Sequence, residues 1–87
     1  MISPETPSLR ESPTDSTEVT DYDLALAPTY LRLLDADAEG ASWQEAATIV
    51  LGLDCTTDPH RAKQIHAAHL ARAKWMTREG WKQLLDS

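Results

Sequence analysis

The chain has 87 residues, 41% of them hydrophobic and 6% aromatic, and a formal net charge of −6. This length allows one small domain, on which a deep catalytic cleft is hard to build, so we expect a binding protein and not an enzyme. The single cysteine, Cys55, excludes an intramolecular disulfide and a thiolate metal cluster.

The charges are divided unevenly along the chain. Residues 1–59 carry 2 basic and 12 acidic side chains, whereas residues 60–87 carry 6 basic and 2 acidic ones. The first segment therefore has a net charge of −10 and the second a net charge of +4. A dedicated nucleic-acid-binding domain is normally basic overall, so this pattern predicts attraction to phosphate over one short region only.

The expected location is the cytoplasm. Residues 1–10 lack the basic flank and the apolar run of a signal peptide, and no run of about 18 apolar residues that could span a membrane occurs.

Residues 1–20 are rich in Pro, Ser, Thr and acids and poor in large apolar side chains. Such a composition predicts a disordered acidic tail, and residues 21–87 are then the folded domain. In the segment 21–27, Tyr22, Leu24 and Leu26 alternate with other residues, which fits either a short strand or a helical turn capped by Asp21. We expect this segment to pack against the domain as an arm.

The first long helix is predicted over residues 28–39. Pro28 suits a first helical position, and Gly40 suits a C-terminal stop. The side chains expected on its buried face are Tyr30, Leu31, Leu34 and Ala38.

A second helix is predicted from Trp43 to about Leu51. Ser42 and Glu45 have the spacing of a capping box, and Gly52 marks the end of the helix. Its apolar stripe consists of Trp43, Ala46, Ala47, Val50 and Leu51.

The longest helix is predicted between Asp58 as its N-cap and Gly80 as its stop, with Pro59 in the first turn. One further helical turn follows at Trp81–Leu85. At 100° per residue the predicted buried face comprises Ala62, Ile65, His69, Ala73 and Met76, and the opposite face comprises Lys63, Lys74 and Arg78. The fold class is therefore expected to be all-α, a compact three- to four-helix domain resembling a helix-turn-helix.

Candidate chemistry is sparse. His66 and His69 are close enough along a helix to face one metal ion, but no suitable third ligand is near, and a buried, hydrogen-bonded His69 is expected instead. Cys55 has His60 nearby but no recognisable base or oxyanion hole. We expect no catalytic residue, no metal and no cofactor.

The order of helix, turn and helix around Gly52 is that of DNA-binding modules, in which the second helix enters the major groove. Three acids, Glu45, Asp54 and Asp58, lie next to that surface and would repel phosphates. The connection between the two helices is also longer than usual. Both features argue against DNA binding. A sequence-specific DNA-binding repressor is therefore the alternative function, with these reading positions: His60, Arg61, Lys63, Gln64 and Ala67.

Two stretches carry a resemblance to a known family. Asp35–Gly40 followed by Ser42–Gly52, and the closing stretch Ala73–Leu85, are similar to a proteobacterial family of unknown-function domains found in small regulators of integrative and conjugative elements. Trp81 stands where the family has Tyr, and Lys82 where it has Arg. The resemblance covers roughly residues 28–85 and implies a helix-turn-helix-like fold in a transcriptional regulator.

An acidic single-domain member resembles the QseM-type antiactivators. The implied function is to bind and inhibit transcriptional activators of quorum sensing and of element excision and transfer through protein–protein contacts. The last helix has fewer arginines than in members that join transcription complexes, which favours a protein partner over DNA. Trp75 is either a core-edge residue or an anchor for this partner. The expected partner-binding surface consists of Asp35, Asp37, Glu39, Arg61, Gln64, Ala68, Arg72 and Trp75.

Overall fold

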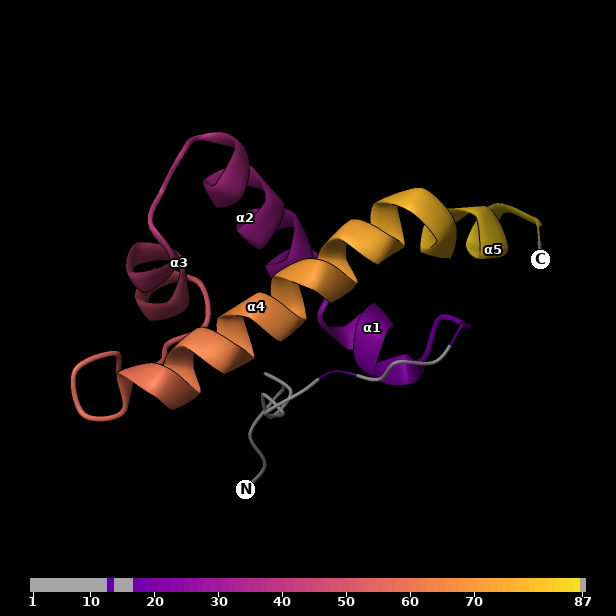
Figure 1. The fold of residues 1–87 in the computed structure, drawn as a ribbon. Coiled ribbons are helices and arrows are strands. Elements are labelled where there is room, and N and C mark those ends of the chain that lie inside the picture. Colours follow the sequence, from indigo (N-terminus) through magenta and orange to yellow (C-terminus); the bar gives the residue numbers. More distant parts are fainter. Residues whose placement is uncertain (1–12, 14–16, 87) are drawn as a thin grey trace, which may run out of the picture.

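The computed structural model describes residue 13 and residues 17–86, and every regular element in them is helical, as predicted (Figure 1). Figure 1 shows α4 running through the middle of the domain with the other helices arranged around it. The elements are α1 (Asp21–Ala25), α2 (Ala27–Ala38), α3 (Trp43–Ile49), α4 (Pro59–Trp75), the π-helical turn η1 (Met76–Gly80) and α5 (Trp81–Asp86).

The predicted N-caps of α3 and α4 are confirmed, and α3 ends at Ile49, two residues before the predicted Leu51. The Ser42 hydroxyl accepts a hydrogen bond from the Glu45 amide at 3.2 Å, and the Glu45 carboxylate accepts one from the Ser42 amide at 3.4 Å. Asp58 caps α4 by accepting from the Arg61 amide at 3.2 Å. Gly40 and Gly52 have φ values of +82° and +68°, the left-handed conformation that ends a helix.

The segment that begins at residue 21 is a short helix and not a strand. Thr20, not Asp21, is its N-cap, and the Thr20 hydroxyl accepts from the Asp23 amide at 3.3 Å. Tyr22 and Asp23 are buried, so the segment packs against the domain as expected. We call residues 17–26 the arm.

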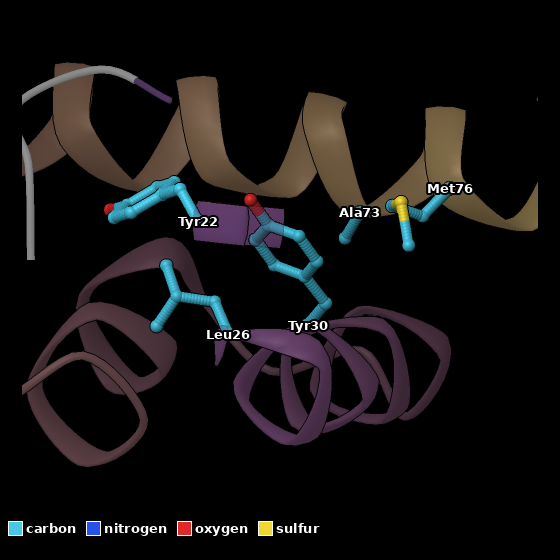
Figure 2. Close-up of a cluster of buried hydrophobic side chains, with 5 residues drawn as sticks. All are labelled: Tyr22, Leu26, Tyr30, Ala73 and Met76. Carbon is cyan, nitrogen blue, oxygen red and sulfur yellow. The ribbon is translucent and has the colours of Figure 1, made fainter. Parts of the chain in front are cut away.

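The buried face predicted for α4 is confirmed, since Ala62, Ile65, His69, Ala73 and Met76 are all buried. Ala73 and Met76 form one buried cluster with Tyr22, Leu26 and Tyr30, and Figure 2 shows the Tyr30 ring between the two arm residues and the other two side chains.

The buried face predicted for α2 is partly wrong. Tyr30 and Leu33 are buried, whereas Leu31 is 52% exposed. Leu34 is half-buried and Ala38 is exposed. The helix is turned toward the Leu33 side because Tyr30 is held in the core by both the arm and α4.

The predicted stop at Gly80 is wrong. The helix ends its α-geometry at Trp75 but continues through η1 directly into α5. A Cβ atom on Gly80 would lie 2.5 Å from the Met76 sulfur and 3.1 Å from the Trp75 ring. A side chain at position 80 would therefore force the buried Met76 side chain to shift.

The predicted tail falls largely on residues 1–12 and 14–16, which lie outside the described part of the chain. Residues 17–20 are held against α5, because Gln83 donates to the Thr17 carbonyl at 2.6 Å and accepts from the Val19 amide at 2.8 Å. Within residues 13 and 17–86, no helix combines the length and the hydropathy that crossing a membrane requires.

Candidate functional site

A groove with a volume of about 340 Å³ lies on the outer side of α3 and α4. Trp43 of α3 forms one wall, and α4 supplies Ala67, Leu70 and Ala71. Trp43 and Leu70 are half-buried, which leaves apolar surface open to a ligand. The remaining lining residues are Lys63, His66 and Lys74.

A second apolar pocket lies where α2 meets the end of α4 and α5, between Leu31, Leu34 and Trp81. Its volume is only about 10 Å³, close to the space that one water molecule needs. It cannot accept a side chain without rearrangement, so the α3–α4 groove is the better candidate.

The five residues predicted to read DNA are all exposed on the first half of α4. His60, Arg61 and Gln64 lie with Lys63 and Ala67 on the side of the helix away from the core. The structure thus brings this predicted set together on one surface.

Two acids precede this surface, and both are fixed by the fold. Asp58 caps α4. Asp54 accepts hydrogen bonds from the Thr57 hydroxyl at 2.7 Å and from the amides of Thr57 and Thr56 at 3.0 and 2.9 Å. These bonds lower the pKa of Asp54, so the carboxylate stays charged beside the start of α4.

The eight residues predicted to bind a partner are divided between the end of α2 and α4. Asp35, Asp37 and Glu39 are exposed at the end of α2. The Asp37 carboxylate lies 3.6 Å from Lys74, on the groove side of α4. Arg61 and Gln64 are exposed and Ala68 is half-buried.

Arg72 is the correction in this set, because it is buried and not on an exposed edge. Its guanidinium lies 3.8 Å from the centre of the Trp75 ring and donates to the Glu18 carbonyl at 3.0 Å. Trp75 is half-buried and packs against the core cluster, as does Val19. The arm therefore covers the Arg72 end of the expected partner surface and leaves Arg61 and Gln64 exposed.

The main polar feature of the interior is an ion pair between the arm and α4. Asp23 is fully buried and accepts from Arg72 Nε at 2.9 Å and from Arg72 Nη2 at 2.7 Å. It also accepts from the Tyr30 hydroxyl at 3.1 Å and from the amide and hydroxyl of Thr20, both at 3.0 Å. Burial alone would raise the pKa of Asp23, but these bonds, led by Arg72, lower it to about 2.

The same ionised carboxylate affects its neighbour. Burial and the negative charge of Asp23 raise the pKa of Tyr30 far above its ordinary value, so its hydroxyl remains a hydrogen-bond donor.

His69 is a second polar link between the arm and α4, buried and hydrogen-bonded as predicted. Its Nδ1 lies 2.8 Å from the Ile65 carbonyl, which can only accept, so Nδ1 carries the proton. Nε2 then accepts from the Tyr22 hydroxyl, also at 2.8 Å. Burial lowers the pKa of His69 and of His66, and both are neutral near pH 7.

Cys55 is engaged in the connection between α3 and α4. Its sulfur accepts from the Thr48 hydroxyl at 3.4 Å and donates to the Gln44 carbonyl at 3.8 Å. These contacts tie the connection back to α3.

Several groove residues were absent from the predicted partner surface. Lys63, Ala67, Leu70 and Lys74 recur at spacings of four, three and four, which is a second helical stripe visible in the sequence. The wall provided by Trp43 could not be found in this way, because it belongs to another helix.

No described protein family matches the chain, and no curated protein sequence is significantly similar to it.

Proposed function

We propose that this protein is an antiactivator, which binds a transcriptional activator through protein–protein contacts and so prevents its action in quorum sensing and in the excision or transfer of an integrative and conjugative element. The observation that carries the proposal is the α3–α4 groove. Its Trp43 and Leu70 side chains offer apolar area to a protein segment, whereas a DNA backbone would leave that area uncovered.

The net charge of −6 supports the same choice. An acidic protein is repelled by DNA at long range, so this charge disfavours a nucleic-acid partner and favours a protein partner.

A DNA-binding repressor is the second candidate function. The observation that favours it is the gathering of His60, Arg61, Lys63, Gln64 and Ala67 on the exposed side of α4. The charged acids Asp54 and Asp58, fixed at the start of that helix, oppose it.

Two measurements test the proposal. In a reporter strain, the protein should lower transcription driven by an activator encoded near its own gene, and a two-hybrid assay should detect the pair. In fluorescence anisotropy, a labelled duplex from the region upstream of its gene should show no binding at physiological salt.

The opposite result would be a tight DNA complex whose affinity falls steeply with salt. Lys63→Glu and Gln64→Ala should then weaken it, and the repressor would replace the antiactivator as the function.

A further inference from the structure

The α3–α4 groove has the length of a short helical ligand. Lys63 and Lys74 mark its two ends on α4. At 1.5 Å rise per residue, their positions on the helix axis are about 16 Å apart, the length of three turns of a second helix laid alongside.

The surface between these lysines suits helix packing. Ala67 and Ala71 lie one turn apart and are small, so the backbone of a partner helix can come close to α4. Leu70 and Trp43 stand beside them and can pack against apolar side chains that recur at spacings of three and four.

A lysine stands at each end of the groove. The ammonium group of Lys63 lies 5.9 Å from the centre of the Trp43 ring, and Lys63 forms no ion pair with any residue in the described part of the chain. Lys74 forms an ion pair with Asp37 at 3.6 Å, but both side chains are 49% exposed. Such an exposed pair contributes little, so Lys74 can pair with an acidic group of a ligand instead. On a chain with a net charge of −6, two cations at the ends of an apolar groove select for acidic groups.

We infer that the α3–α4 groove binds an amphipathic helix of about three turns, with an apolar ridge that packs on Trp43 and Leu70 and an acidic residue at each end of that ridge. This inference rests on the proposed function, and it identifies the part of the activator that is captured. An activator whose acidic amphipathic helix lies in the groove cannot use that helix for its own contacts.

A pair of synthetic peptides tests this inference directly. The first is a fluorescein-labelled helix of 18 residues with leucines at spacings of three and four and glutamates on its other positions next to the ridge. The second has the same leucines and carries lysine in place of every glutamate. Anisotropy titrations of the full-length protein should show at least tenfold tighter binding of the acidic peptide.

Three variants locate the bound peptide. Lys63→Glu should weaken the acidic peptide about tenfold, and Ala67→Trp, which fills the groove from an exposed position, should abolish its binding. Lys82→Glu makes the same charge change at an exposed position of α5 outside the groove and should alter the affinity less than twofold. Circular dichroism spectra identical to the wild type would show that each variant is folded.

Equal affinities for the two peptides, no binding of the acidic peptide, or binding that Ala67→Trp leaves unchanged would each overturn the inference. The reporter assay separates this failure from that of the proposed function. Repression of the reporter by both the wild type and Ala67→Trp would support the antiactivator function and reject the groove as the binding site. Selective binding of the acidic peptide without any effect on the reporter would support the groove as a binding site and reject the antiactivator function.

Discussion

Replacing Asp23 with asparagine should unfold much of the protein, because the change leaves the buried Arg72 guanidinium without its counter-ion. Asp23 is fully buried and Arg72 is 6% exposed. Loss of one member of a buried ion pair typically costs about 3–5 kcal/mol. A folded domain of about 70 residues has a free energy of unfolding of only about 4–10 kcal/mol.

The lowered pKa of Asp23 indicates a stabilising ion pair, in the same direction as this cost. Its value falls from 3.8 to about 2 in the folded chain. A shift of this size corresponds to roughly 2 kcal/mol of stabilisation near pH 7. The substitution costs more, because the buried guanidinium of Arg72 then loses the carboxylate that accepts two of its hydrogen bonds.

Urea unfolding followed by circular dichroism measures the loss. Asp37→Asn is the matched control, since Asp37 makes an ion pair with Lys74 in which both side chains are half exposed. The control should lose less than about 1 kcal/mol. The double variant Asp23→Asn/Arg72→Met should be more stable than the sum of the single changes predicts. A loss in Asp23→Asn no larger than in Asp37→Asn would refute this account of the core.

Three further outcomes are expected. The pKa of His69 lies below the 6.5 of the unfolded chain, so the unfolded state binds the proton first and the free energy of unfolding falls as pH drops below about 6.5. His69→Gln should therefore reduce the difference between the free energies of unfolding measured in urea at pH 7.5 and at pH 5.5. An unchanged difference would contradict this. Gly80→Ala should lower the free energy of unfolding by about 1–3 kcal/mol through the clash with Met76, whereas a stabilised variant would show that only helix propensity matters there. Gln83→Ala should cost about 1–2 kcal/mol and speed amide exchange in the arm, because two hydrogen bonds to residues 17 and 19 disappear; unchanged exchange would show that α5 does not hold the arm.

The parts of the fold that the sequence predicts are those determined by neighbours in the chain. A capping box needs only Ser42 and Glu45, and a left-handed glycine needs only the residues around Gly40 or Gly52. The buried stripe of α4 follows from its period of 3.6 residues. Each of these signals acts within one helix, and each is confirmed.

The parts of the fold that the sequence does not predict depend on which segment packs over a given face of a helix. Arg72 lies at the edge of the α4 stripe, and its helical position alone does not say whether water or Asp23 meets it. The two residues are 49 positions apart in the sequence. The choice of Leu33 over Leu31 on α2 and the role of Gly80 have the same origin, since both are decided by contacts with other side chains.

The candidate site divides in the same way. The exposed stripe of α4 that contains Lys63 and Leu70 follows from the sequence period, but the groove exists only because α3 places Trp43 beside it. The arm covers Arg72 for a similar reason, since Glu18 and Asp23 reach it from far along the chain.

The buried pair also changes the electrostatic argument about DNA. The sequence gives residues 60–87 six bases, but Arg72 is neutralised by Asp23 in the core and Lys74 lies beside Asp37. The positive surface of α4 is therefore weaker than the count of bases implies. The opposing acids cannot be removed without loss to the fold, because Asp58 caps α4 and Asp54 holds the preceding turn through three hydrogen bonds. A helix whose N-cap and preceding turn must keep two carboxylates is poorly suited to approach phosphates, whereas Leu70 and Ala71 of the groove lie about three turns further along the helix.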